Sequence, residues 1–83
     1  MRRFVGEAVQ VEMERGAPHT VCWAGRRIAV EVRAEVDRPD RSSDWRLRRH
    51  HRRFLVEDGS GLLLELRQDR QGCWTLWAVD DQA

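Results

Sequence analysis

Lysine and tyrosine are absent from this chain of 83 residues, and cysteine and proline occur only twice each. The fifteen basic residues are therefore all arginine, whose planar guanidinium binds carboxylates, phosphates and aromatic faces. A genome-wide coding bias toward arginine explains the same choice, so the residue type alone identifies no ligand. No apolar run approaches the roughly 20 residues of a membrane-spanning helix. Met1–Phe4 has no hydrophobic stretch behind it of the kind found in a signal peptide.

The scarcity of cysteine and the missing export signal bear on compartment and on metal binding. Without an export signal we expect a cytoplasmic protein, in which Cys22 and Cys73 stay reduced. These cysteines and the histidines His19, His50 and His51 show no CxxC or HxxxH spacing. We therefore predict two buried free thiols, no metal site and no other cofactor. At this length the chain has room for one domain with one small core, spanning 1–83.

Alternation of apolar and polar residues with a period of two dominates the chain, and no window shows a convincing apolar stripe at helical spacing. Strands are expected at Glu7–Glu14, Thr20–Trp23, Arg26–Val36, Phe54–Val56, Leu62–Arg67 and Cys73–Val79. Turn signals separate them, notably Ala24-Gly25 and Asp58–Gly61. The pattern predicts an all-β single domain, either a small barrel or a strongly bent antiparallel sheet of five to six strands.

The same alternation divides the side chains between a core and an outer surface. Trp77 and Val79 have the opposite parity to Trp74 and Leu76, so Trp77 is expected to be exposed. Residues 37–44, rich in aspartate, are expected to form a loop, and 80–83 a frayed tail. The predicted core consists of Val9, Val11, Val21, Trp23, Ile28, Val30, Val32, Phe54, Val56, Leu64, Trp74 and Leu76.

Positive charge is concentrated in 45–54, where five arginines and two histidines fall within ten residues of a chain whose net charge is only +1. Such a concentration indicates a local anionic partner. As a strand, the segment has two polar faces, so we expect it to project as a ribbon or lie at an exposed edge until Phe54. One alternative is a charged edge that prevents aggregation and pairs with Asp37, Asp40 and Asp44.

Two sets of side chains are candidate binding sites. Arginines of the basic segment, and those beside the Ala24-Gly25 turn, are expected to contact nucleic-acid backbone: Arg46, Arg48, Arg49, Arg52, Arg53, Arg26 and Arg27. Trp77 and Trp45 are expected to contact a protein partner. Tryptophan also stacks on bases, so Trp45, Trp74 and Trp77 are alternative platforms for a single strand.

Three landmarks follow one another along the chain: PHTVCWAGRR at 18–27, RRFLVED at 52–58 and GCWTLWAVD at 72–80. Together they resemble a small family of bacterial domains of unknown function, the DUF6504 type. The second and third also resemble the C-terminal segment of the inactive Y-family-polymerase-like subunit of the bacterial mutasome. The resemblance implies an accessory role in error-prone DNA repair and translesion synthesis. His50 and His51 stand where the family has an aromatic residue, so no stacking role is carried over to that strand.

No catalytic constellation is visible. Ser42, Ser43 and Ser60 lie in loop or turn segments without a partner base, and Gly59 and Gly61 lack the lysine and the helix of a phosphate-binding loop. We therefore expect no enzyme activity. The leading hypothesis is an accessory module that binds DNA or RNA backbone. The alternative is a docking module that binds an acidic protein partner, or self-associates as a weak homodimer, through Trp77 and an edge strand.

Overall fold

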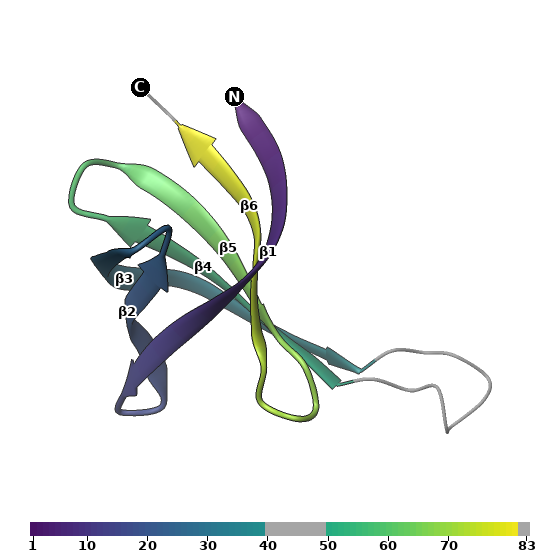
Figure 1. Ribbon diagram of the computed structural model, residues 1–83. Coiled ribbons are helices and arrows are strands. Elements are labelled where there is room, and N and C mark those ends of the chain that lie inside the picture. Colours follow the sequence, from purple (N-terminus) through teal and green to yellow (C-terminus); the bar gives the residue numbers. More distant parts are fainter. Residues whose placement is uncertain (40–49, 82–83) are drawn as a thin grey trace.

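The computed structural model describes residues 1–39 and 50–81, and that part of the chain forms six β-strands. Figure 1 shows them as one continuous meander with the two chain ends at the same end of the molecule. The strands are β1 (Arg2–Glu14), β2 (Ala17–Trp23), β3 (Arg26–Pro39), β4 (His50–Asp58), β5 (Leu62–Gln68) and β6 (Trp74–Asp81).

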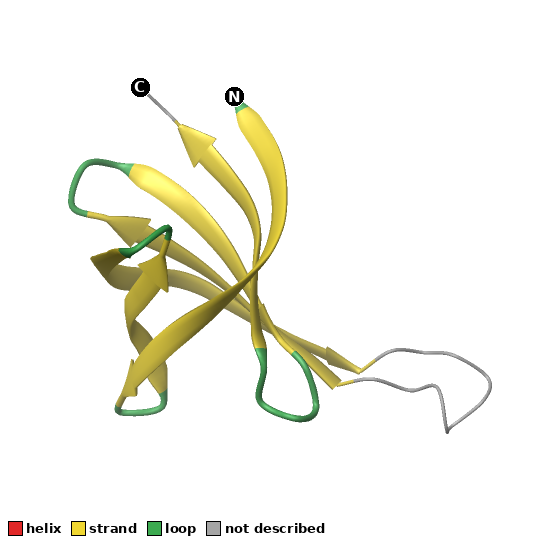
Figure 2. Ribbon diagram, in the orientation of Figure 1, coloured by secondary structure: helices red, strands yellow, loops and turns green. Residues whose placement is uncertain are grey.

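The sheet closes on itself. Each strand pairs antiparallel with the next in sequence, and β6 returns to pair with β1. Figure 2 shows strands joined by turns, with no helix in the described part of the chain. Ala24 and Gly25, between β2 and β3, have φ values of 52° and 74°, as a two-residue hairpin of the mirror-image type requires. The predicted small all-β barrel is therefore confirmed.

The two longest strands, β1 and β3, are each shared between two neighbours. Arg26–Ala29 of β3 pairs with β2, and the rest of β3 pairs with β4. β1 divides in the same way between β6 and β2, changing partner after Val9. β1 contains two bulges, between Phe4 and Glu7 and between Glu12 and Met13, and β3 contains one between Val32 and Ala34. Because a bulge bends a strand and increases its twist, six short strands can close around a small core.

The core fills the barrel and contains seven of the predicted residues: Val21, Val30, Phe54, Val56, Leu64, Trp74 and Leu76. The other five, Val9, Val11, Trp23, Ile28 and Val32, are half-buried and pack against it. Leu66, Ala78 and Val79 are also buried, although the sequence did not predict them. Trp74 is only 7% exposed, so the alternative that it stacks on bases is wrong.

A bulge in β6 reverses the facing of its last residues. Glu65 pairs with Ala78 and Leu66 pairs with Leu76, so Trp77 is an extra residue relative to β5. Since a bulge places two successive side chains on one face, Val79 turns inward and is 7% exposed. The prediction that Val79 shares the outer face with Trp77 is wrong. Trp77 lies outside the core, but it is half-buried rather than exposed.

The strand ends differ from the predicted loop and tail. β3 runs on to Pro39, so the predicted loop at 37–44 is wrong for its first three residues. β6 continues to Asp81, whose carbonyl oxygen accepts a 2.9 Å hydrogen bond from the N-terminal ammonium of Met1. The predicted frayed tail is therefore wrong for Asp80 and Asp81. Residues 40–44 and 82–83 lie outside the described part of the chain.

Candidate nucleic-acid interface

The ends of β3 and β4 extend beyond the rest of the sheet. β5 pairs with β4 only as far as Arg52, whereas β3 and β4 stay paired to the end of β3. We call this two-stranded extension, 38–39 with 50–51, the β3–β4 arm; it leads away from the barrel in Figure 1. The ribbon predicted for 45–54 is confirmed at 50–51, while 45–49 lie outside the described residues. The alternative of an exposed edge is wrong from Arg52 onward, because β4 there has a neighbour on both sides.

Arg52 and Arg53 have different surroundings. The Arg52 guanidinium forms a 2.6 Å ion pair with Glu35 and lies 4.9 Å from the ring centroid of the core residue Phe54. Arg53 is exposed and makes no ion pair with any described residue. Its register partner on β5 is Arg67. Of Arg52 and Arg53, the second is therefore the one whose guanidinium is open to an added anion.

Arg26 and Arg27 lie at the other end of β3, beside the β2–β3 turn. Arg27 reaches across β2 and forms a 2.6 Å ion pair with Glu12 of β1, while Arg26 is exposed. The partner of Arg53 on β3 is Val36, ten residues beyond Arg26. The structure therefore does not bring Arg26 and Arg27 into one surface with Arg52 and Arg53, the described arginines of the basic segment.

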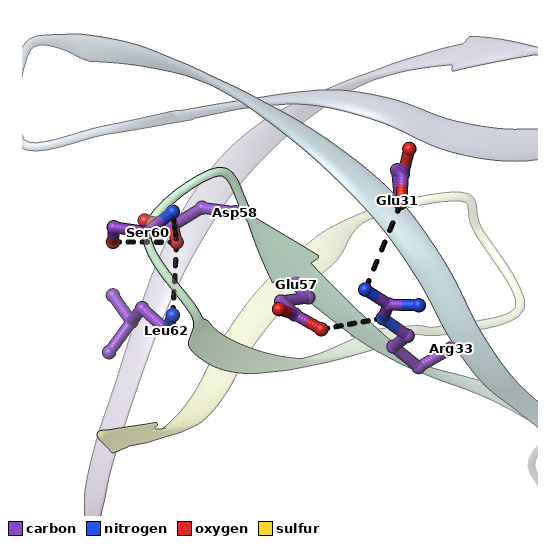
Figure 3. Close-up of polar contacts among 6 residues, drawn as sticks. All are labelled: Glu31, Arg33, Glu57, Asp58, Ser60 and Leu62. Atoms are coloured by element: carbon purple, nitrogen blue, oxygen red, sulfur yellow. Dashed lines mark hydrogen bonds and ion pairs between the residues drawn. The ribbon is translucent and has the colours of Figure 1, made fainter. Parts of the chain in front are cut away.

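The surface near the β4–β5 turn is acidic. Figure 3 shows Arg33 between Glu31 and Glu57, with its Nε donating a 2.6 Å hydrogen bond to Glu57. A hollow of about 570 Å³ beside them is lined by Glu31, Glu57 and Asp58 together with Arg33 and His19. Because three carboxylates surround the one arginine, this hollow does not suit a phosphate.

Asp58 holds the β4–β5 turn together. Its carboxylate accepts hydrogen bonds from the backbone N–H and hydroxyl of Ser60, each 2.8 Å long, and from the N–H of Leu62 at 3.0 Å (Figure 3). Burial raises the pKa of this carboxyl, but the hydrogen bonds outweigh it and leave the pKa below the usual value. The carboxylate therefore has a structural role in the turn.

Four side chains form a line across the outer face of the barrel, one each from β1, β6, β5 and β4: Phe4, Trp77, Arg67 and Arg53. The rings of Phe4 and Trp77 lie 5.0 Å apart, edge to face at 84°. The Arg67 guanidinium lies 3.7 Å from the centroid of the Trp77 ring, which is a cation–π contact. We call these residues the aromatic–arginine line. It joins the predicted partner residue Trp77 to the predicted nucleic-acid residue Arg53.

A bulge in β1 positions Phe4 at the end of this line. Gly6 has a φ of +68°, and a Cβ atom there would lie 2.7 Å from Cζ of Phe4. The ring therefore rests directly on the Gly6 backbone, where only glycine provides both the conformation and the space. Phe4 remains 65% exposed. Its register partner Ala78 lines a hollow of about 270 Å³ on the same face.

Glu65 holds Arg67 in place. Arg67 Nε donates a 2.8 Å hydrogen bond to one carboxylate oxygen, and Arg2 donates to the other. Burial raises the pKa of Glu65, but the bonds from Arg67 and Arg2 outweigh it and leave the pKa below its usual value. The carboxylate thus stays ionised and orients Arg67 over Trp77.

Glu65→Gln is expected to lower the free energy of unfolding by about 1–2 kcal/mol at pH 7. The lowered pKa means that this stabilisation is present above the ordinary glutamate pKa of 4.5 and is lost as pH falls through the lower folded-state pKa. Urea unfolding at pH 7 and pH 3 should therefore show a difference from the parent that shrinks in acid. Glu31→Gln, whose carboxylate is 81% exposed, is the control with little effect at either pH. A difference for Glu65→Gln that is equal at both pH values would contradict this role.

Some of the predicted site residues lie outside the described part of the chain: Trp45, Arg46, Arg48 and Arg49.

Sequence reasoning also missed two members of the aromatic–arginine line. For Phe4 a signal existed, since a glycine two residues after an aromatic suggests a strand bulge covered by the ring. For Arg67 there was none, because its neighbours are set by strand register.

Cys22 is half-buried and Cys73 is exposed, and both are free thiols. The prediction that both are buried is therefore wrong: Cys22 is only partly buried, and Cys73 lies just before β6 instead of inside it. Among residues 1–39 and 50–81, no three His, Cys, Asp or Glu side chains gather closely enough to hold a metal ion. The same residues include no helix with the length and apolar character to cross a membrane.

Comparisons of the chain with protein-family models, with curated proteins and with solved structures find no match. The resemblance to the DUF6504-type domains and to the mutasome subunit therefore stays a prediction. The features of the protein that bear on its function are the charges of its arginines and the aromatic–arginine line.

Proposed function

We propose that this protein is a non-catalytic module that binds nucleic-acid backbone through the β3–β4 arm and the residues flanking it. The observation that carries the proposal is a separation of charge. The stretch 36–54 contains seven arginines and three aspartates, a net charge of +4, in a chain of net charge +1, so the remainder carries −3. A phosphate backbone is attracted to the first part and repelled by the second.

Ion pairing within the barrel supports the same assignment. Four barrel arginines are already bound to a glutamate: Arg2, Arg27, Arg33 and Arg67. A phosphate would have to compete with these carboxylates for the arginines. Arg52 is likewise already paired with a carboxylate, that of Glu35. Arg53 has no such competitor among the described residues. Arg3, Arg15 and Arg26 also have none among those residues, but Arg53 is the one of the four that lies near the arm on β4, and Arg46, Arg48 and Arg49 precede it in the chain.

Phosphate contacts position a protein on nucleic acid without reading its sequence. Such a module acts as an accessory to another protein's chemistry. The resemblance to the DUF6504-type domains suggests error-prone DNA repair in the bacterial cytoplasm as its setting. This part of the proposal depends on the resemblance alone.

Arg53→Glu is expected to weaken binding of fluorescently labelled DNA roughly tenfold, because it removes a phosphate contact and adds a repulsive charge next to the arm. Arg26→Glu is the matched control. It makes the same change in net charge at an exposed site, at the end of β3 that lies away from the arm. It should leave the DNA affinity within about twofold of that of the parent protein. Fluorescence anisotropy at about 50 mM salt measures both. Equal losses in the two variants would show that only overall charge matters, which rejects the arm as the site.

A protein-docking module is the second candidate, and the exposure of Phe4 beside Trp77 favours it. Docking through an edge strand has no support, since each strand of the described barrel pairs on both sides. A docking module would bind an acidic partner or a second copy through the Trp77 face. Its binding would fail in Trp77→Ala and would be weakened less by Arg53→Glu, the reverse of the pattern expected for phosphate binding.

A further inference from the structure

Contacts with phosphates alone do not distinguish single-stranded from double-stranded nucleic acid. The outer face beside the arm carries side chains that could make this distinction. We propose that Phe4 is a stacking platform for a base of single-stranded nucleic acid whose backbone is held by Arg53. The inference rests on the proposed function and deepens it by naming the substrate as a single strand. It uses the aromatic–arginine line, all of whose residues are described.

The Phe4 ring is both fixed and open. It rests on Gly6 and meets Trp77 at its side, yet 65% of the residue is exposed. An aromatic ring held this way needs no reordering to accept a base, which lowers the entropy cost of binding. Stacking on such a ring is tolerant of sequence, since every base has a π face. Bases of a duplex are already stacked on both sides, so only a single strand can use the platform.

The charges along the line complement a phosphate backbone. Glu65 neutralises Arg67, which in turn covers Trp77, so Trp77 is not the open ring. Arg53 lies directly opposite Arg67 and has no carboxylate of its own among the described residues. Phe4 pairs with Ala78 and lies in the register row of Leu55, two residues along β4 from Arg53. Three strand spacings of about 4.8 Å and this offset of about 6.6 Å separate the backbones of Phe4 and Arg53 by roughly 16 Å. A short stretch of single strand can therefore place a base on Phe4 and a phosphate at Arg53, and then continue along the basic arm.

A second copy of this chain is a weaker fit for the same face. A two-fold contact joins this face to its own copy. The carboxylate beside the aromatic–arginine line, Glu65, already binds Arg67 and Arg2, so it is not free for the charges of the two Arg53 side chains. Nucleic acid neutralises these charges instead. The face is also continuous with the arm, because β4 contains both Arg53 and one strand of the arm.

The test compares Phe4→Ala, Phe4→Trp and the parent on three labelled probes of equal length: an oligothymidylate, a strand of abasic sites and a duplex. Stacking of one base predicts that Phe4→Ala lowers oligothymidylate affinity roughly 5- to 150-fold. Binding to the abasic strand and to the duplex should stay within about twofold. Phe4→Trp, which keeps an aromatic face, should restore oligothymidylate binding. Thermal unfolding followed by circular dichroism verifies that each variant is folded.

The outcomes separate this inference from the proposed function. If the parent binds all three probes and Phe4→Ala changes none, base stacking is overturned while backbone binding stands. If the parent binds no probe, both fall together. If Phe4→Ala leaves DNA affinity intact but abolishes a dimer seen by sedimentation, the face is an interface between copies and the single-strand inference is overturned.

Discussion

Phe54→Ala is expected to destabilise the protein by about 3–5 kcal/mol. A chain of this length has a free energy of unfolding of roughly 4–12 kcal/mol, so the substitution should remove about a quarter of that free energy or more. The reason is the position of Phe54 at the centre of the core, 0% exposed, with its ring 5.6 Å from that of Trp74. Urea unfolding followed by circular dichroism measures the change directly.

The only other phenylalanine supplies the control. Phe4→Ala removes the same side chain from a site that is 65% exposed, and it loses mainly the edge-to-face contact with Trp77. We expect a cost of about 1 kcal/mol. Equal destabilisation by the two substitutions would contradict the described packing, because it would mean that the two rings are equally buried.

Val79→Asp should prevent folding. Val79 is 7% exposed and faces the core, so the substitution buries a carboxylate without a partner, at a cost of several kcal/mol. Strict alternation along β6 would instead place this residue on the outer face with Trp77, where aspartate would be tolerated. The experiment therefore tests the bulge at Trp77 as well as the core.

Thr75→Asp is the matched control for Val79→Asp, since both residues have the parity of Trp77 in the sequence. Thr75 is half-buried and its register partner is Arg67, so a carboxylate there has an opposite charge across the strand pair. We expect a change in unfolding free energy of less than about 1 kcal/mol. If Val79→Asp is tolerated as well as Thr75→Asp, the facing of β6 is not as described.

The barrel was predictable because alternation and turn residues are local signals. Ala24-Gly25 and the Asp58–Gly61 turn mark hairpins that the structure contains, and Phe54 and Leu64 occupy the faces that alternation gives them. The errors arise where a bulge adds one residue to a strand and reverses the facing beyond it. The bulge at Trp77 depends on pairing with β5 and leaves no mark in the sequence of β6, so Val79 was placed on the wrong face.

The candidate site was less predictable because it depends on which strands are neighbours. The concentration of arginine at 45–54 is visible in the sequence, but its pairing partners are not. Strand register places Arg53 opposite Arg67 and Arg26 at the far end of β3, and a side-chain ion pair joins Arg52 to Glu35. Two arginines adjacent in sequence thus differ in their availability to a phosphate.

The most direct test of the central claim is the salt dependence of DNA binding. Anisotropy of labelled single- and double-stranded DNA would be measured with the purified protein across roughly 50 to 200 mM salt. Engagement of four or five phosphates predicts that the logarithm of the binding constant falls with the logarithm of salt concentration with a slope of about −3 to −4.5. A slope in that range supports backbone binding by the basic segment. A slope near zero, or no binding at the lowest salt, would contradict it.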